Sequence, residues 1–406
     1  MSGGGHHHRE ILPLLPTYDP PAELDGLGKK GLIVGFFALI ATLVGGLMAN
    51  DHFTQFYRSY LIGFLFVFAL SAGCWSISLV HHLSRGKWGV MIRRSLEAAA
   101  ANLPLVAVMF VPIVFGIHSL YEWSHTEVVA GDPILSRKAA YLNANMFILR
   151  SAFYFVSFSL LAMWIRRLSL KQDQTGDPAL APKMQKIAAG SLLFYILAMT
   201  FAAVDWVMSL TPHWFSTIYG LYFVIGQGIA GMAFTILMCK FLSKLEPLAK
   251  RFSTENFHDY GKLLFAWTLV WTYFSLSQFL IIWSGNLPEE LSWFYGRIKG
   301  GWKPVSLMLV FLHFVLPFLL LLSRSRKQNI TRLARVAALM LFMRLVDLIW
   351  LTAPAFSPDV LKIHWMDITA PIGLFGIWLF FYVRNLRSRS ILPLHEPYLR
   401  EALGHV

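Results

Sequence analysis

The stretch Asp205-Trp-Val-Met-Ser-Leu-Thr211-Pro212-His-Trp-Phe215-Ser216 closes one long apolar segment of the chain, and Asp347-Leu-Ile-Trp-Leu-Thr352-Ala-Pro354-Ala-Phe356-Ser357 closes another. In both stretches an aspartate inside the apolar segment precedes a proline by seven residues. A carboxylate within a lipid bilayer costs several kcal/mol unless it is paired, hydrated or protonated. The repetition therefore predicts an internally duplicated membrane protein and marks where its polar chemistry lies.

The composition indicates a polytopic membrane protein. Of the 406 residues, 56% are hydrophobic and 14% are charged, and the mean hydropathy is +0.55. A soluble chain of this length cannot bury so much apolar surface. We expect an all-α fold with ten transmembrane helices, at residues 31–49, 60–80, 98–120, 146–165, 187–210, 217–239, 263–283, 304–322, 336–353 and 366–383.

The basic residues predict the topology. Segments on the side of the N-terminus hold 26 Lys and Arg, whereas segments on the other side hold 7. Because cytoplasmic loops carry the excess of positive charge, we expect both termini in the cytoplasm and ten crossings of the membrane. This placement also accounts for the sequence pI of about 9.7 without nucleic acid as a partner.

Four spans separate the two Asp-x6-Pro stretches, which favours two parallel four-helix bundles. We expect a cytoplasmic tail (1–30), a peripheral first span with its loop (31–57), a first bundle (58–215), a second bundle (216–357), a peripheral tenth span (358–383) and a cytoplasmic C-terminal tail (384–406). Coincidence in Leu- and Phe-rich sequence is the alternative explanation of the repeat.

Six polar side chains are expected in the outer third of the bilayer, namely His118, Arg150, Asp205, Gln278, Arg344 and Asp347. Charges at this depth face the bundle interior and find partners. Sign and depth predict the pairs Arg150–Asp205 and Arg344–Asp347, of which the second joins neighbours on one helix face. Deeper in the bilayer we expect Tyr154, Ser157, Ser159, Tyr195, Gln227, Tyr273 and His313.

Two interpretations of these groups remain open. They form either a polar pocket open towards the outer face, connected to a proton path, or structural ion pairs that fix the rotation of the helices. We expect Asp205, with His118 and Arg150, to be the functional site, because a histidine near a carboxylate titrates in the useful pH range. Arg344, Asp347, Gln278 and His313 are expected to form a structural ion pair or part of a proton path.

The sequence predicts no cofactor on this chain. Cys74 and Cys239 lie inside apolar segments and outside any C-x-x-C motif, which excludes an attached c-type haem. A b-type haem needs two histidines at similar depth, whereas His118 and His313 differ by ~10 Å along the membrane normal. The triplet His6-His7-His8 is too short to indicate a metal site.

Two motifs resemble one known family. The stretch Ala203-Val-Asp-Trp-Val-Met-Ser-Leu-Thr-Pro-His-Trp-Phe-Ser-Thr-Ile-Tyr-Gly220 is similar to the fifth-span signature of a membrane subunit of bacterial alternative complex III. The stretch Ser277-Gln-Phe-Leu-Ile-Ile-Trp-Ser-Gly-Asn-Leu-Pro-Glu-Glu290 is similar to the same family. This subunit is the smaller (ActF-type) of two polysulfide-reductase NrfD-like proteins, described as quinone-binding subunits of quinol:cytochrome c oxidoreductase, and the similarity extends over nearly the whole chain.

The resemblance implies a subunit without redox centres in a quinol-oxidising complex of a respiratory or photosynthetic chain. It implies an NrfD-like sister subunit and separate subunits that carry haem c and iron–sulfur clusters, with menaquinol or ubiquinol as the substrate of the complex. It also implies quinol binding near the periplasmic face of the first bundle, where a histidine and an aspartate of the sister take protons; His118 and Asp205 lie on the corresponding spans.

A secondary transporter is the alternative function, because transporters are also built from repeats with charges near the core. We expect no span with the mid-membrane Gly or Pro break that forms a transporter's substrate site. Gly226, Gly228 and Gly231 in the sixth span come nearest to such a break.

Overall fold

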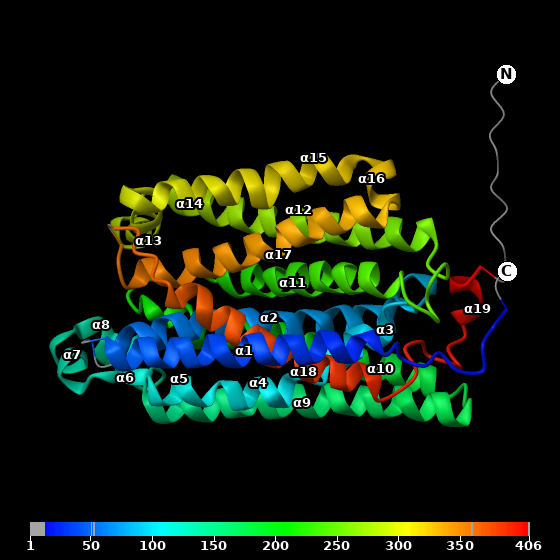
Figure 1. Cartoon of the computed structure of the whole chain (residues 1–406). Helices are drawn as coiled ribbons and strands as arrows, with labels where there is room; N and C mark the ends of the chain where they lie inside the picture. The colour runs from blue at the N-terminus through cyan, green and yellow to red at the C-terminus, as the bar shows by residue number, and fades with distance from the viewer. Residues whose placement is uncertain (1–12, 50, 52, 359, 405–406) are drawn as a thin grey trace, which may run out of the picture.

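The computed structural model describes residues 13–49, 51, 53–358 and 360–404, which form an all-α molecule without strands. Ten of its helical segments are long and apolar enough to cross a membrane, which confirms the predicted fold class. These segments lie side by side along a common direction (Figure 1). Residues 1–12 of the predicted N-terminal tail and 405–406 of the C-terminal tail lie outside the described residues.

Eight spans are single helices, and two are broken into shorter pieces. The single helices are α1 (Glu23–Met48), α2 (Thr54–Ser84), α9 (Ala144–Thr175), α10 (Leu180–Trp206), α11 (Tyr219–Leu242), α12 (Thr254–Gly285), α17 (Ile330–Thr352) and α18 (Met366–Arg387). The third span consists of α3 (Arg93–Ala100), α4 (Leu103–Met109) and α5 (Val111–Phe115), followed by α6 (Ile117–Leu120). The eighth consists of α14 (Lys303–Met308), the π-helical η5 (Leu309–Val315) and α15 (Leu316–Leu322).

Prolines account for the two broken spans. Pro104 and Pro112 lie in the first turns of α4 and α5, and Pro317 follows η5. Proline lacks the backbone N–H that would continue the helical hydrogen bonds, so the chain restarts a helix or widens into a π-turn. The glycine-rich α11, by contrast, is one continuous helix.

Two four-helix units pack against each other through α2 and α11. In the first unit α10 contacts α9 and α2, and in the second α17 contacts η5 and α11. The backbones of α2 and α11 approach so closely that a Cβ atom added at Gly73 would lie 1.9 Å from the carbonyl oxygen of Gln227. A Cβ at Gly231 would lie 2.5 Å from the backbone of Gly73. Glycine at both positions lets the two units meet without intervening side chains.

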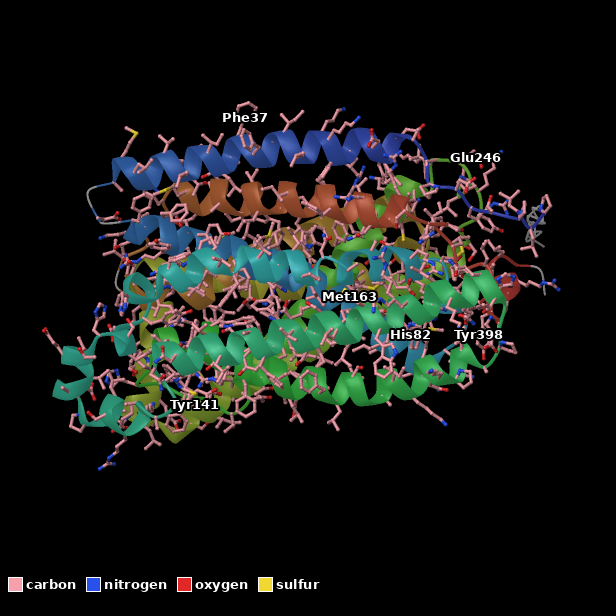
Figure 2. The ribbon with its side chains drawn as sticks, turned by 90° about the horizontal axis from the view of Figure 1, so that it is seen from below. Phe37, His82, Tyr141, Met163, Glu246 and Tyr398 are labelled. Atoms are coloured by element: carbon pink, nitrogen blue, oxygen red, sulfur yellow. The ribbon has the colours of Figure 1, made fainter. Side chains whose placement is uncertain are left out.

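Helices α1 and α18 form a pair beside the first unit. Gly35 on α1 and Gly376 on α18 allow close backbone contact, since a Cβ at either would lie within 3 Å of the other helix. Helix α18 also packs against α2, and Trp378 on it is buried and donates a hydrogen bond to Ser71 Oγ at 2.7 Å. Helix α1 lies at the periphery, and its exposed Phe37 points away from the bundle (Figure 2).

The short connecting helices divide between the two ends of the bundle. Helices α7 (Thr126–Gly131), α8 (Pro133–Lys138) and α13 (Pro288–Ile298) lie at one end, and α16 (Arg324–Gln328) and α19 (Leu399–Ala402) lie at the other (Figure 1). We call these the outer and inner ends, following the predicted topology. The described chain begins and finishes at the inner end, where Ile391 N–H donates to the Tyr18 carbonyl oxygen at 2.8 Å.

Candidate functional site

The Asp205 carboxylate, near the outer end of α10, is fully paired. Arg150 on α9 donates from Nε to Oδ2 at 2.9 Å and from Nη2 to Oδ1 at 2.8 Å, and the Tyr154 hydroxyl donates to Oδ2 at 2.9 Å. The guanidinium lies 3.8 Å from the centre of the Tyr141 ring. The pair predicted from sign and depth is therefore present, and it joins α9 to α10. Each oxygen of the carboxylate accepts a hydrogen bond from the Arg150 guanidinium.

His118 lies on α6, away from this arrangement. Its side chain is exposed, its Nδ1 is 3.1 Å from Ser124 Oγ, and the ring of His125 is 5.5 Å away. The structure therefore does not make His118 the partner that sets the proton affinity of Asp205. The break of the third span into α4, α5 and α6 redirects this residue from the position that a straight helix would give it.

The second ion pair, Arg344 with Asp347, lies on α17 and is completely buried. Arg344 Nη1 bonds to Asp347 Oδ2, and Tyr222 on α11 donates its hydroxyl to Oδ1. Gly226 makes room for the guanidinium, because a Cβ there would lie 2.3 Å from Arg344 Nη1. The second predicted pair is thus also present, between neighbours on one helix.

Several buried polar atoms around the Arg344 site lack partners in the described part of the chain, as does the hydroxyl of Tyr141 beside Arg150 at the Asp205 site. Among the described residues, Arg344 Nε and Nη2 have no hydrogen-bond acceptor, and both amide atoms of the buried Gln227 lack a partner. Gln227 follows Gly226, on which the guanidinium rests. A buried polar group without a hydrogen bond costs free energy, and ordered water usually satisfies such groups. This region therefore has the chemistry of a hydrated site inside the bundle.

Further buried polar groups continue from Gln227 towards the inner end. The backbone of Gln227 touches Gly73 on α2, and Ser76 lies one turn further along that helix beside the Tyr195 hydroxyl of α10. Ser191 Oγ, one turn below Tyr195, has no partner within the described part of the chain. By helix rise, Ser191 lies ~6 Å closer to the inner end than Tyr195.

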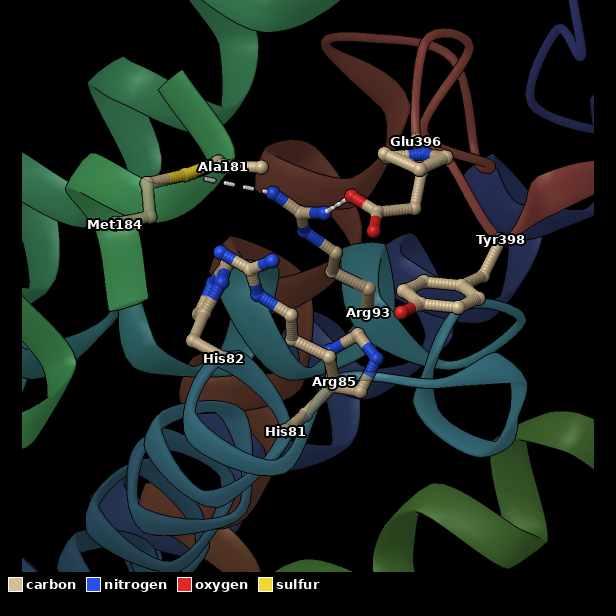
Figure 3. A pocket seen from close by; sticks show the side chains of 9 residues that line it. His81, His82, Arg85, Arg93, Ala181, Met184, Glu396 and Tyr398 are labelled. Atoms are coloured by element: carbon tan, nitrogen blue, oxygen red, sulfur yellow. Dashed lines mark hydrogen bonds and ion pairs between the residues drawn. The ribbon is translucent and has the colours of Figure 1, made fainter. Parts of the chain in front are cut away.

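A cavity of about 80 Å³ lies further towards the inner end, and Ser76, Tyr195 and Ser191 do not line it. Its lining includes His81 and His82 at the end of α2, which are buried, and His81 Nδ1 and His82 Nε2 lack partners among the described atoms. Figure 3 shows these imidazoles on one side of Arg93 and the Glu396 carboxylate, which is bound to Arg93, on the other. The volume is sufficient for several water molecules.

We call these groups the polar file; its members are Asp347, Arg344, Tyr222, Gln227, Tyr195, Ser76, Ser191 and His82. By helix rise along α11 and α2, it covers about 20 Å of the roughly 30 Å thickness of a bilayer core. It lies between the two four-helix units, with members on α2, α10, α11 and α17.

Of the other predicted site residues, His313 lies nearest the Arg344–Asp347 pair. It is buried in η5 within electrostatic reach of both residues, its two ring nitrogens lack a partner among the described atoms, and its ring stacks on Trp271 with the ring centres 4.3 Å apart. Gln278 on α12 is bound only weakly, by the Ser216 hydroxyl at 3.5 Å. Tyr273, predicted at mid-membrane, is 64% exposed on the outside of α12, so it takes no part in the polar file.

A cavity of about 230 Å³ opens at the outer end, but the predicted site residues do not line it. Its walls combine both repeated stretches, with Pro212 from the first and Pro354 from the second. Arg297 on α13 also lines it and donates to the carbonyl oxygens of Trp350 and Leu351, closing the C-terminal end of α17. Burial lowers the pKa of Arg297 to about 9.

Sequence reasoning did not identify Tyr222, Ser76, Ser191 or His82 as members of the file. Tyr222 was detectable in principle, since it lies near the outer end of the sixth span, at the depth expected for Asp347. The sequence does not reveal the rotation of each helix about its own axis. That rotation decides whether a polar side chain faces the neighbouring helices.

Comparison with family models and with curated proteins finds no match to this chain. Within the described residues, no group of three or more His, Cys, Asp or Glu is placed to hold a metal ion. Cys74 and Cys239 are buried and are not joined to each other. The candidate site is thus defined by its own geometry, as two outer ion pairs of which one continues into a buried polar file.

Proposed function

We propose that this chain is an integral membrane subunit of a quinol:electron-acceptor oxidoreductase of the alternative complex III type, and that its polar file conducts protons. The two motifs that resemble the NrfD-like subunits of that complex support the oxidoreductase. The polar file supports proton conduction. The proposal places the protein in a bacterial inner membrane with both termini in the cytoplasm, on the basis of its positive-charge asymmetry.

The unsatisfied polar atoms of the file are the observation that carries the proton path. Arg344, Gln227, Ser191 and His82 each keep at least one buried atom without a described partner. A core whose only task is packing gains stability when such groups are replaced by apolar side chains. We infer that water molecules between these groups satisfy the unpaired atoms and transfer protons.

Asp347, at the outer end of the polar file, is the proposed proton-exchanging group. Its carboxylate has a hydroxyl donor, Tyr222, and a guanidinium that retains unused donors. Water bound there competes with Asp347 for Arg344, so the carboxylate has more than one arrangement available. A group with alternative partners can change its protonation during turnover, whereas a locked group cannot.

The Asp205 site belongs, in this proposal, to a quinone-type pocket near the periplasmic face. Arg150 is 19% exposed while Asp205 is fully buried, so the guanidinium forms the accessible side of the pair. It presents N–H donors that suit a quinone carbonyl oxygen. His118 is exposed at the outer end and accepts protons directly from that side.

The redox centres lie in partners in this proposal. Subunits with haem c and iron–sulfur clusters receive the electrons of menaquinol or ubiquinol, and an NrfD-like sister subunit lies beside this chain. Affinity purification of the tagged protein from its native membrane tests the assignment. We expect haem-containing partners and quinol:cytochrome c reductase activity in the eluate. Purification of the folded protein without haem, and with substrate-dependent ion flux after reconstitution, would establish a transporter instead.

A further inference from the structure

A groove of about 500 Å³ lies at the inner end between α15, α16 and α17. Three arginines, Arg326, Arg332 and Arg335, form one part of its wall. The remainder is aliphatic and consists of Leu320, Val336 and Leu339. The groove therefore combines three positive charges with an apolar surface on helices that cross the membrane.

The positive charges of the groove have no counterion in the described part of the chain. None of the three arginines forms an ion pair there, and the sequence between Glu290 and Asp347 contains no Asp or Glu. On the neighbouring α12, Glu255 and Asp259 are already paired with Lys87 and Lys262, at 3.3 and 3.0 Å. The groove must therefore obtain its negative charge from another molecule.

The first turn of α17 adds to the positive potential. It contains no acidic residue, and Arg332 lies in it, at the end of the helix where the backbone dipole is also positive. Placing a cation there is unfavourable for the helix alone. An anion bound between Arg332 and Arg335 would compensate both the side chains and the helix end.

The order of residues along α17 matches the shape of a phospholipid. Arg332 and Arg335 come first, and Val336 and Leu339 follow towards the middle of the membrane, over ~10 Å of helix rise. On α15, Leu319 and Leu322 are more than half exposed and extend the apolar surface. A charged headgroup at one end and an acyl chain along the helix would satisfy both parts of the groove.

We propose that this groove binds one anionic phospholipid of the membrane. Its phosphate contacts Arg326, Arg332 and Arg335, and an acyl chain covers Leu320, Val336 and Leu339. The inner end is the one assigned to the cytoplasm, where basic pockets between transmembrane helices bind such headgroups. The alternative is that these arginines are hydrated charges that serve only to orient the chain in the membrane.

Arg324 provides a matched control, because it lies in the same loop, is exposed and does not line the groove. It contributes to membrane orientation as much as each groove arginine does. A lipid site predicts that Arg332→Gln and Arg335→Gln each weaken lipid binding while Arg324→Gln does not, whereas a general charge effect predicts the same loss for each of these single substitutions.

The test uses the full-length protein, with whatever partners co-purify, in a mild neutral detergent. Thermal unfolding is followed while phosphatidylglycerol, phosphatidylcholine or inorganic phosphate is added, and retained lipid is quantified by mass spectrometry. We expect phosphatidylglycerol alone to raise the Tm of the wild-type protein. Each groove substitution should weaken its apparent affinity about five-fold, and Arg324→Gln should leave it unchanged.

Three results would overturn the lipid site. Equal stabilisation by phosphatidylcholine would show that headgroup charge is irrelevant, and equal stabilisation by inorganic phosphate would show that the acyl chain is irrelevant. Equal loss of affinity in Arg324→Gln would show a general charge effect. If Arg332→Gln or Arg335→Gln does not fold, Arg326→Gln, at an exposed position on α16, gives the same comparison with Arg324→Gln.

Discussion

The two ion pairs that close the repeated spans have the same charges but different surroundings. Asp205 is bound by two nitrogen atoms of Arg150 and by the Tyr154 hydroxyl, and the pair joins two helices. Asp347 is bound by one nitrogen atom of Arg344, on its own helix, and by the Tyr222 hydroxyl from a neighbouring helix. The first carboxylate is saturated with donors, whereas the guanidinium of the second keeps two nitrogen atoms unused.

If the two units arose by duplication, this difference would separate a structural from a reactive site, as we propose. A bidentate pair across two helices fixes their relative position and leaves no place for water at the carboxylate. The Arg344–Asp347 pair does not itself join two helices, although Tyr222 of α11 bonds to Asp347, and the unused donors of Arg344 can bind water that leads to Gln227. The geometry therefore favours Asp347 as the proton-exchanging carboxylate, although sequence context alone favoured Asp205.

The largest expected effect is the loss of folding stability when Asp347 or Asp205 is replaced by asparagine. Asp347→Asn leaves the Arg344 charge completely buried and should cost about 3–5 kcal/mol. Asp205→Asn should cost about 1–3 kcal/mol, because Arg150 is partly exposed and stacks on Tyr141. Thermal unfolding of the purified variants, together with their yield from membranes, measures the difference.

A double variant separates this stability effect from chemistry. Arg344→Met with Asp347→Leu removes both charges, and replacing a buried pair by apolar residues is often neutral. We expect this variant to recover most of the stability and to lack proton transfer. Greater destabilisation by Asp205→Asn than by Asp347→Asn would contradict the comparison.

Hydropathy, charge and depth were enough to predict the ten spans and the partners of Asp205 and Asp347. These quantities depend on position along the chain, which the sequence gives directly. The assignment of His118 to Asp205 assumed a straight third span. The prolines of α4 and α5 interrupt that helix, and His118 follows the interruption.

The polar file could not be assembled from sequence because it depends on helix rotation. Gln227 and Tyr273 have similar mid-membrane positions in their spans, yet Gln227 is buried between the units and Tyr273 faces outward. The hydrophobic residues around them occupy all faces of these helices and do not mark an inner side. The contact between Gly73 and Gly231 orients α2 and α11, and it is visible only in three dimensions.

A matched pair of tyrosine variants tests which carboxylate takes part in proton transfer. Tyr222→Phe removes the hydroxyl bound to Asp347, and Tyr154→Phe removes the hydroxyl bound to Asp205. A hydrogen bond to a charged group contributes about 1.5–3 kcal/mol, so we expect Tyr222→Phe to slow proton-coupled turnover at least ~10-fold. Tyr154→Phe should change it less than about three-fold, since Arg150 still holds Asp205 at two points.

The measurement is the rate of quinol-driven proton release by the purified complex in proteoliposomes. The thermal stability of both variants is measured alongside, so that loss of folding is not mistaken for loss of chemistry. Slower turnover in Tyr154→Phe than in Tyr222→Phe, at equal stability, would return the proton-exchanging role to Asp205.

The smallest expected effect distinguishes a hydrated file from ordinary packing at Gln227. Both amide atoms of Gln227 lack a described partner, so Gln227→Leu removes an unsatisfied buried group and should leave stability unchanged or raise it by about 1 kcal/mol. Proton transfer should nevertheless fall several-fold, because leucine cannot hold water between Arg344 and Tyr195.

Gln278→Leu is the control, since Gln278 is also buried but its amide oxygen accepts a bond from Ser216 outside the file. It should leave proton transfer unchanged. If Gln227→Leu stabilises the protein and transfers protons at the wild-type rate, the unpaired atoms are only imperfect packing, and the comparison between the two ion pairs loses its functional meaning.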